Sequence, residues 1–220
     1  MNTNITRAPA ELVQRFAKIP SSNISDCMNR LYSMKGSLRP YNSIPLAGTA
    51  FTVRVPANDN AFIHYALDLV KPGDILVVDA GGEVGAALMG EIMFTYAQQR
   101  GITGIIVDGA IRDVDCLQTL PLAVYAKGVT PRGPYKTGPG EINQPVSCGG
   151  QVVFPGDILI GDADGVIVIP QDDAPHLVDL AEAKLQDEER RLARYRLGEL
   201  DAEKHFKEYH DLLVKLGAKL

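Results

Sequence analysis

Apolar and polar positions alternate along the chain with two periods, one typical of a helix and one typical of a strand. Helices are predicted over residues 11–18, 24–32, 61–70, 86–100 and 114–119. Short apolar runs that follow Gly or Pro turns are instead typical of strands, and β-branched runs indicate strands buried on both faces. Strands are predicted over residues 48–55, 75–78, 104–107 and 122–125.

The order of these elements indicates an α/β fold. Residues 71–107 read as turn, strand, glycine-rich loop, helix and strand, which together form a parallel crossover unit. Residues 130–141 carry many Gly and Pro residues and are expected to form a loop, whereas residues 145–170 contain only strand and turn patterns. We therefore expect an α/β catalytic or binding domain over residues 1–170.

The last part of the chain has the composition of a long helix from about residue 172 to residue 216, with a break at Gly198. At ~1.5 Å per residue this helix would be about 60 Å long, which exceeds a compact domain of this size. Its apolar positions are Leu177, Leu180, Leu185, Leu192 and Leu197. We expect residues 171–220 to form a helical arm that packs on a neighbouring subunit of a homo-oligomer. The alternative is a charged helix that faces solvent.

Charge and cysteine content exclude several classes of protein. The net charge of −5 leaves no broad basic surface for a phosphate backbone, so no nucleic-acid partner is expected. Cys27, Cys116 and Cys148 are far apart and form no CxxC pair, which argues against disulfides and a Cys-type zinc site. The N-terminus lacks the apolar core of a signal peptide, and no apolar run reaches membrane-spanning length. We expect a cytoplasmic protein with reduced thiols and no membrane partner.

Arg112 and Asp113 form the first candidate site. They follow the predicted strand at 104–107, at the edge of an α/β sheet where ligands bind. An Arg guanidinium offers a planar fork for a carboxylate or a developing oxyanion, and an Asp carboxylate is an oxygen ligand for a hard cation. The alternative is a surface Arg and Asp that end a turn.

Gly90, Glu91, Ile92 and Met93 form the second candidate site. If the helix begins near Gly90 instead of at its predicted start, its free N–H groups form an anion site. Glu91 would then face the Arg-Asp pair, because both segments leave the same edge of the sheet. The alternative is that Glu91 is an exposed helix residue.

Gly81, Gly82 and Gly85 form a loop after a buried strand, and Asp108 ends the next strand. This arrangement resembles a dinucleotide-binding loop. However, the order is G-G-x-x-G instead of G-x-G-x-x-G, and the chain lacks the repeated βαβ halves. A nicotinamide or flavin enzyme is therefore the lesser alternative.

Isolated residues carry weaker signals. His64 is interpreted as a partly buried histidine on an apolar helix face, and Cys148 as a packed thiol. Arg132 and Lys136, in the loop at 130–141, would either meet a substrate carboxylate or be solvated. No His/Cys cluster has zinc spacing, and no GxSxG motif is present.

Longer strings that cover most of residues 23–170 keep a shared order and spacing. They are SDCMNRLYS, LAGTAFTV, NDNAFIHYAL, KPGDILVVD, GEIMFTYAQQRGITGIIVDGAIRD and GEINQPVSCGGQVVFPGDILIGDADGVIVIP. In these strings the chain resembles the RraA-like family, which includes 4-hydroxy-4-methyl-2-oxoglutarate / 4-carboxy-4-hydroxy-2-oxoadipate aldolases. The resemblance implies an α/β/β/α sandwich like the swivelling phosphohistidine domain, with a long C-terminal helical arm. It also implies a homotrimer or homohexamer.

The resemblance implies roles for single residues. In the aldolase pattern an acidic residue, usually Asp, is followed by twenty residues and then by an Arg-Asp pair, and here Glu91 takes the acidic position. Arg112 would hold the pyruvyl oxygen, and Asp113 would anchor a magnesium or manganese ion. The backbone amides of residues 90–93 would hold the pyruvyl carboxylate, which favours a helix that begins there. A neighbouring subunit's Glu contributes to the site in these aldolases, and Glu199 is the local candidate.

These roles imply a divalent-metal-dependent class II pyruvate aldolase that cleaves 4-hydroxy-2-oxo acids and also decarboxylates oxaloacetate. The cation would act as a Lewis acid, Arg112 would stabilise the enolate, and Glu91 would orient a water that takes the hydroxyl proton. The sequence offers no candidate for a Schiff-base lysine. The alternative is an RraA-type protein that binds the RNA-degradation machinery without catalysis. Such chains usually end soon after the β-rich part and lack the acidic residue.

Overall fold

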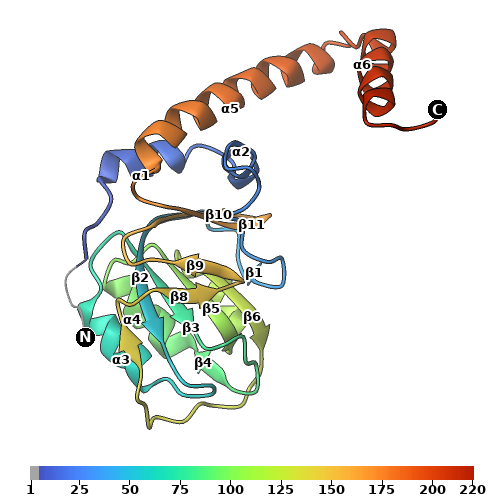
Figure 1. Cartoon of the computed structure of the whole chain (residues 1–220). Helices are drawn as coiled ribbons and strands as arrows, with labels where there is room; N and C mark the ends of the chain where they lie inside the picture. Colours follow the sequence, from blue (N-terminus) through green and yellow to red (C-terminus); the bar gives the residue numbers. More distant parts are fainter. Residues whose placement is uncertain (1–4) are drawn as a thin grey trace. The chain divides into compact units, whose positions relative to one another are not determined.

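The structure, a computed structural model, describes residues 5–220 and has a mixed α/β fold (Figure 1). Residues 1–4, part of the stretch in which no signal peptide is expected, lie outside the described residues. The helices of the described chain are α1 (Ala10–Phe16), α2 (Ser21–Cys27), α3 (Ala61–Leu69), α4 (Glu91–Gln99), the 3₁₀ helix η1 (Val114–Gln118), α5 (Ala174–Arg196) and α6 (Ala202–Lys215). Its strands are β1 (Arg39–Pro40), β2 (Leu46–Arg54), β3 (Asp74–Asp79), β4 (Ala87–Met89), β5 (Gly104–Ile111), β6 (Ala123–Val129), β7 (Glu141–Ile142), β8 (Val146–Cys148), β9 (Gln151–Val153), β10 (Ile158–Asp162) and β11 (Gly165–Ile169).

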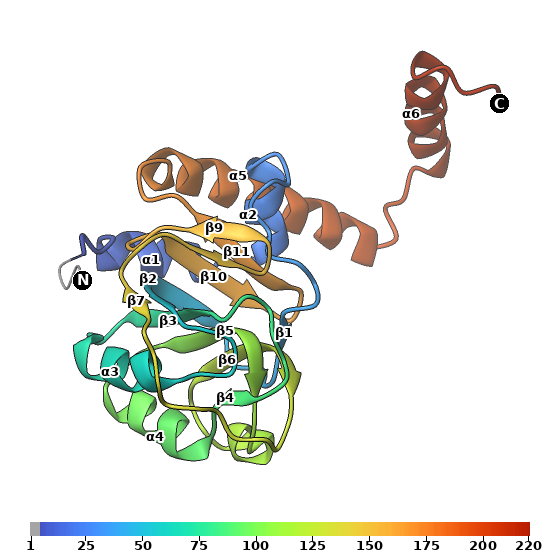
Figure 2. The same ribbon diagram turned by 60° about the horizontal axis from the view of Figure 1, so that its bottom comes forward.

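Most of the strands join into one sheet that curves into a nearly closed barrel (Figures 1 and 2). Its order is β1-β6-β5-β3-β2-β10-β11, with β4 beside β5 and β7 beside β2. The pairs β2–β3, β3–β5 and β5–β6 are parallel, whereas β10 is antiparallel to both of its neighbours. The hairpin β8–β9 forms a separate two-stranded sheet. The parallel β3–β5 pair confirms the crossover unit predicted over residues 71–107.

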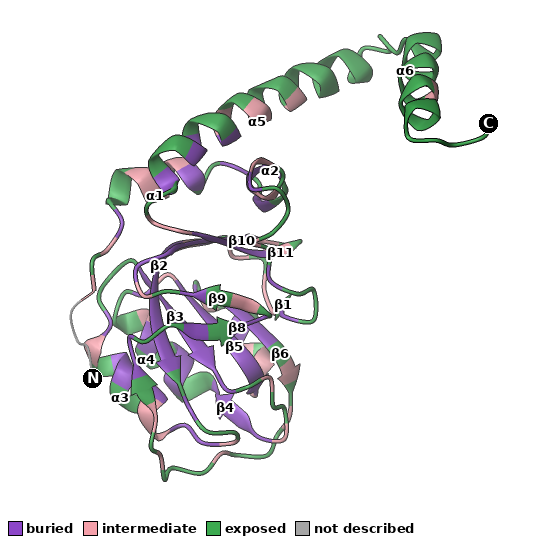
Figure 3. Ribbon diagram, in the orientation of Figure 1, coloured by how far each residue is buried: buried purple, intermediate pink, exposed green. Residues whose placement is uncertain are grey.

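Alternate side chains of the central strands enter two separate apolar clusters. In β3, Leu76 and Val78 pack in a cluster with residues of α3 and α4, while Ile75 and Val77 pack in a cluster with residues of the hairpin β8–β9. Figure 3 shows β3 and β5 as buried along their whole length. Full burial of each such side chain contributes about 1.5–3 kcal/mol to stability. The strand is buried on both faces, as its continuous apolar run predicts.

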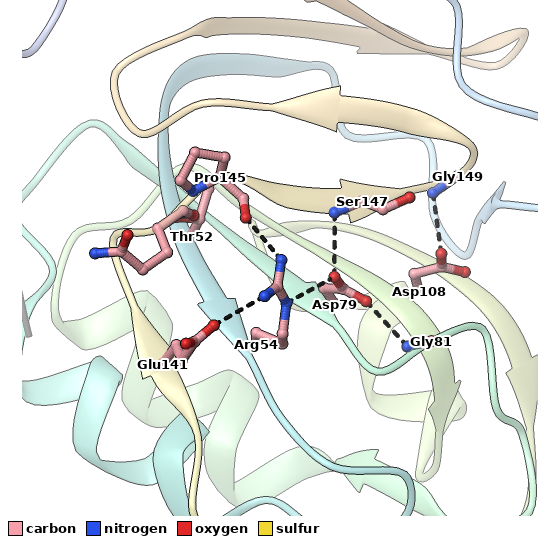
Figure 4. Close-up of polar contacts among 10 residues, drawn as sticks. Thr52, Arg54, Asp79, Gly81, Asp108, Glu141, Pro145, Ser147 and Gly149 are labelled. Carbon is pink, nitrogen blue, oxygen red and sulfur yellow. Dashed lines mark hydrogen bonds and ion pairs between the residues drawn. The ribbon is translucent and has the colours of Figure 1, made fainter.

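Polar groups at one end of the sheet attach the hairpin β8–β9 to the parallel strands (Figure 4). Asp79, the last residue of β3, accepts a hydrogen bond from Ser147 N at 3.1 Å and pairs with Arg54 Nε at 3.4 Å. Asp108, its register partner on β5, accepts a hydrogen bond from Gly149 N at 3.1 Å. Both carboxylates are buried, so removal of either would leave an unpaired amide under the hairpin.

Cys148 lies between these two attachment points. Burial, followed by the nearby carboxylates of Asp108 and Asp79, raises the pKa of its thiol well above the ordinary value. The thiol therefore stays neutral and packs in the core, which confirms its interpretation as a packed thiol. All three cysteines are free, as expected.

Residues 86–100 do not form a single helix, so this prediction was wrong at its beginning. Strand β4, Ala87–Met89, precedes the helix and pairs in parallel with β5, and α4 begins only at Glu91. A hydrogen bond from Arg112 N to Met89 O, at 3.0 Å, holds β4 in place. Pairing with a neighbouring segment thus overrides the helix propensity of Ala, Leu and Met. The later start, inferred from the family resemblance, is confirmed.

The second helix is also displaced from its prediction. It was expected over residues 24–32, but α2 covers Ser21–Cys27. Asn29 and Arg30 have φ angles of 55° and 62°, and a left-handed backbone cannot continue a right-handed helix. The other helices and strands predicted before residue 126 agree with the structure to within a few residues.

The structure confirms the predicted α/β class and the C-terminal helices. It agrees with the predicted α/β/β/α sandwich only in part. Helices do lie on two sides of the strands: α3 and α4 on one side, and α1 and α2 beside β2, β10 and β11 on another (Figures 1 and 2). However, hydrogen bonds connect the strands into one curved sheet instead of two stacked sheets.

The chain divides into two compact units, one that ends at Glu182 and one that covers Ala183–Leu220. The break predicted at Gly198 is confirmed, because its φ of 78° separates α5 from α6. Leu177 is buried in the first unit at 6% exposure, so the expectation that it needs a neighbouring subunit was wrong. A separate domain over residues 171–220 stays a prediction. Within the described part of the chain, every helix is too short or too polar to span a bilayer.

Candidate functional site

A cavity of about 220 Å³ lies where β4, the end of β5 and the start of α4 meet. Its lining residues are Asn60, His64, Ala87, Leu88, Met89, Gly90, Ile92, Met93, Arg112, Asp113, Pro134 and Lys136. The structure therefore brings the two candidate segments of the sequence together in one cavity. It adds a second wall, built from α3 and from the loop that precedes β7.

Arg112 and Asp113 are placed by the end of β5. Arg112 follows the last strand residue, and its Nε lies 3.5 Å from Asp113 Oδ2. Asp113 has a φ of 57°, a left-handed conformation that Asp adopts more readily than most residues. The Asp113 carboxylate reaches the start of α4, where Oδ2 accepts a hydrogen bond from Glu91 N at 3.2 Å.

The start of α4 forms an anion-attracting part of the cavity wall. Gly90 precedes the helix in an extended conformation and contributes no side-chain cap. The amides of Ile92 and Met93 lie in the first helical turn, where no intrahelical acceptor exists. Such amides carry the positive end of the helix dipole and bind carboxylates or phosphates. The residues of this turn and Arg112 thus line the cavity together.

Glu91 is only partly where the prediction placed it. Its amide binds Asp113, but its side chain is exposed and does not line the cavity. The Glu91 carboxylate nevertheless lies near Asp113, because both act on the same thiol. Burial raises the pKa of the Cys116 thiol, and the negative charges of Glu91, Asp113 and Asp115 raise it further. A catalytic role for the Glu91 side chain therefore stays a prediction.

The second wall contains residues that the sequence analysis treated as minor. Burial, and then the positive charge of Lys136, lowers the pKa of His64 below 6.5, so its imidazole is neutral at pH 7. Lys136 lines the cavity, whereas Arg132 does not. A lysine is thus present in the cavity lining, and the expectation that no lysine forms a Schiff base stays a prediction.

Asn60 was missed by the sequence analysis. Its Nδ2 donates to Leu88 O at 2.8 Å, which ties the N-terminus of α3 to β4. Its Oδ1 is buried and has no hydrogen-bond partner within the described residues. The Asn-Asp-Asn string before an apolar helix is a capping signal that could have drawn attention to it.

Glu199 belongs to the second compact unit and is not a lining residue of the cavity. Its carboxylate pairs with Arg194 Nε at 3.2 Å. The contribution of Glu199 to a neighbouring subunit's site stays a prediction.

The glycine loop does not have the structure of a dinucleotide site. Gly81 and Gly82 have φ angles of 66° and 75°, and Gly82 N donates to Asp108 O at 3.0 Å. The loop leads into β4 and not into a helix, so it supplies no helix N-terminus for a pyrophosphate. The nicotinamide or flavin alternative loses its structural basis.

The fold and this cavity define a small α/β protein with a pocket, lined by Arg112, Asp113 and the start of α4, at the edge of its parallel sheet. Residues 21–168 match the RraA-like family, described as Aldolase/RraA. A relative from Halalkalibacterium halodurans named "Putative 4-hydroxy-4-methyl-2-oxoglutarate aldolase" is 37% identical over 188 residues, which cover 85% of this chain and 90% of the relative. The chain therefore belongs to the RraA-like family.

Solved structures share the fold. A crystal structure of an uncharacterized protein from Pseudomonas syringae pv. tomato has a TM-score of 0.78 at 23% identity, over 88% of this chain and 96% of that chain. The structure of the RNA-processing inhibitor RraA from Thermus thermophilis has a TM-score of 0.63 at 30% identity, over 68% of this chain and 92% of that chain. The match to RraA thus leaves about a third of this chain uncovered.

The close approach at Gly90 generates a stability prediction. A Cβ atom on Gly90 would collide with the Asp113 carboxylate and would lie 2.9 Å from Arg112 Cγ. We expect Gly90→Ala to lower the free energy of unfolding by about 0.5–1.5 kcal/mol, measured by urea denaturation, because the Asp113 carboxylate must turn away and lose its hydrogen bond from Glu91 N. Gly36→Ala is the matched control, because nothing lies within 4 Å of a Cβ there. Equal unfolding midpoints for the two variants would contradict the close approach.

Proposed function

We propose that this chain is a pyruvate-type aldolase that cleaves 4-hydroxy-2-oxo acids such as 4-hydroxy-4-methyl-2-oxoglutarate, and that it also decarboxylates oxaloacetate. The observation that carries the proposal is the convergence of Arg112, Asp113 and the first turn of α4 on one cavity. Membership of the RraA-like family and the name of the Halalkalibacterium relative support it. Both reactions produce the enolate of pyruvate, so one site serves both.

The chain's own groups match the parts of a 2-oxo acid. The amides of Ile92 and Met93 bind the carboxylate at C1, as helix N-termini bind anions. The guanidinium of Arg112 donates to the 2-oxo oxygen, on which negative charge develops as the carbon–carbon bond breaks. The charge on this oxygen is larger in the transition state than in the substrate, so Arg112 accelerates the reaction and does more than bind.

A divalent cation fits the donor set of the cavity. Asp113 is the one carboxylate that lines it, and no group of three His, Cys, Asp or Glu side chains within residues 5–220 is placed to hold a metal. Mg²⁺ binds through one or two carboxylates and keeps several waters, whereas a structural zinc site needs four protein ligands. Asp113 would hold Mg²⁺ or Mn²⁺, which supplies Lewis-acid polarisation of the 2-oxo acid when bound.

Aldol cleavage also requires removal of the proton from the 4-hydroxyl group. Glu91 is the nearby carboxylate outside the cavity lining, and its amide is already fixed to Asp113. We propose that Glu91, whose side chain is exposed beside the cavity, takes the hydroxyl proton through one water. A Glu in place of the usual Asp makes this reach longer by one methylene group.

The alternative function is that of a regulator that binds other proteins without catalysis. The Thermus structure with this fold is described as an RNA-processing inhibitor. One feature of this chain favours an enzyme: the acidic residue Glu91, which is followed by twenty residues and then by Arg112 and Asp113. A pyruvate-release assay separates the two functions directly.

Activity is expected to depend on a divalent cation. The test is a coupled pyruvate assay over a panel of 4-hydroxy-2-oxo acids and oxaloacetate, with Mg²⁺, with Mn²⁺ and with excess EDTA. We expect turnover with either cation and none with EDTA, because Arg112 alone leaves the enolate charge only partly stabilised. Full turnover in EDTA, or a borohydride-trapped substrate adduct on Lys136, would contradict the proposed mechanism.

Arg112 is expected to be indispensable. Removing one oxyanion donor typically lowers turnover by about a hundredfold or more, and Lys cannot reproduce the planar fork of Arg. We therefore expect Arg112→Ala and Arg112→Lys both to lose at least about a hundredfold in kcat for pyruvate release. Arg100→Lys, on the exposed end of α4, is the control. Near-normal kcat in Arg112→Lys would show that Arg112 is a surface charge.

The protein is expected to assemble as a homotrimer or homohexamer through its C-terminal helices. No residue of α6 is buried, and Phe206, Tyr209 and Leu213 are exposed on it by 69%, 48% and 43%. Multi-angle light scattering at micromolar concentration should report a trimer or hexamer. Phe206→Glu with Leu213→Glu should lower the assembly state, whereas Glu208→Gln should not. A monomeric wild-type protein that still releases pyruvate would refute this interface.

A further inference from the structure

The string Pro-Gly-Asp-Ile-Leu occurs twice in the chain, at residues 72–76 and at residues 155–159. Each copy forms a turn that leads into a strand beside β2, the first into β3 and the second into β10. The two turns have a similar shape, with φ angles of 88° at Gly73 and 101° at Gly156. Asp74 and Asp157 therefore occupy equivalent positions, and the first serves as an internal reference for the second.

Both Asp carboxylates are buried and close their turns in the same way. Asp74 Oδ2 accepts a hydrogen bond from Lys71 N at 2.8 Å, and Asp74 N donates to Lys71 O at 3.0 Å. Asp157 Oδ2 accepts a hydrogen bond from Phe154 N at 2.8 Å, and Asp157 N donates to Phe154 O at 3.1 Å. Each turn thus places one carboxylate where little water can solvate its charge, which favours the neutral form unless a cation lies beside it.

The two carboxylates differ in this cationic partner. The guanidinium of Arg7 binds both oxygens of Asp74, from Nε to Oδ1 at 2.7 Å and from Nη2 to Oδ2 at 2.8 Å. The preceding residue, Thr6, lies against the other turn, because its carbonyl oxygen would be 2.5 Å from a Cβ atom on Gly156. The N-terminal segment therefore passes both turns, but its cation pairs with Asp74.

Asp157 instead faces a second carboxylate. Among residues 5–220, Asp172 is the charged side chain that acts on Asp157, and it repels the ionised form. The neighbouring segment of β2 brings only Thr49 and Ala50 to this turn. Burial raises the pKa of Asp157 to about 6, hydrogen bonds from the backbone amides of Phe154 and Gln171 lower it, and Asp172 raises it again.

The contact with Gln171 connects this turn to the α5 junction, which we define as residues 170–178. The junction leads from β11 into α5, and its buried side chains include Ala174, Leu177 and Val178. If the junction opens, Gln171 moves away and water reaches Asp157, whose pKa then returns toward 3.8. The closed junction therefore binds a proton more tightly than the open one, and lowering the pH from 7.5 through 6 favours the closed state.

We propose that Asp157 is a proton-controlled joint between the β9–β10 turn and the α5 junction. With a proton bound, the joint holds the start of α5 firmly against the first compact unit. After the proton is lost, the buried charge and the repulsion from Asp172 make the junction open more readily. The inference is independent of the proposed aldolase function, because Asp157 does not line the cavity.

Hydrogen exchange of the full chain measures the opening directly. Protection factors of the amides in residues 171–178, corrected for the intrinsic pH dependence of exchange, should be about tenfold higher at pH 5 than at pH 7.5. Asp157→Asn keeps an acceptor for Phe154 N and removes the titration, so its protection should change less than twofold and should exceed that of wild type at pH 7.5. Asp173→Asn, on an exposed neighbour, is the matched control and should keep the tenfold change. The amides of β5 in the same samples report global unfolding.

A titration of the wild-type protein gives a second measurement that needs no folded Asp157 variant. The carboxyl ¹³C signal of Asp157 should titrate with a pKa of about 6, and Asp172→Asn should move this pKa downward. A midpoint near 4 in wild type would overturn the joint. So would equal protection of residues 171–178 at the two pH values, or a pH dependence in Asp157→Asn as large as that of wild type.

Discussion

The hydrogen bond from Glu91 N to the Asp113 carboxylate joins the end of β5 to the start of α4. It depends on two local conformations, the extended backbone of Gly90 and the left-handed backbone of Asp113. Only Gly at position 90 allows the approach, since a Cβ atom would collide with Asp113. The contact brings an Arg, a carboxylate and the amides of a helix N-terminus to one place, and every chemical property proposed for the cavity depends on that meeting.

The Asp59 carboxylate organises the other wall of the cavity, which is built from α3 and from the loop before β7. Asp59 is buried, yet three amides and a hydroxyl donate to it, which compensates for the loss of water. It connects the N-terminus of α3 with the Gly- and Pro-rich loop at 130–141. This connection adds to the backbone hydrogen bonds that Tyr135 forms with Asn58 and Asn60, and it matters because the loop forms little regular structure of its own. The two walls of the cavity are thus each organised by one Asp.

The sequence predicted the parts of the site that lie just after the carboxyl ends of buried strands. The run at 75–78 and the run at 104–107 are apolar enough to require burial on both faces, so the residues after them had to gather at one edge. Residues 86–89 were assigned to a helix because Ala, Leu and Met favour helices, and local propensity contains no information about pairing with β5. His64 and Lys136 stand 72 positions apart. The two residues line one cavity because Asp59 binds the loop that carries Lys136, and no periodic sequence pattern predicts that contact.

The strained geometry at the cavity bears on the choice between enzyme and regulator. A residue in a sparsely populated backbone region costs of order 1–3 kcal/mol, although Asp tolerates the left-handed region better than most residues. The amides of Ile92 and Met93, which have no intrahelical acceptor, and the excess of cations over carboxylates in the cavity lining are further unfavourable features for a protein that only binds a partner through its surface. They become favourable when an anionic acid and a cation enter, because the amides, Arg112 and Asp113 then each gain a partner of opposite charge. A surface-binding regulator would gain nothing from these costs, whereas an aldolase recovers them in every catalytic cycle.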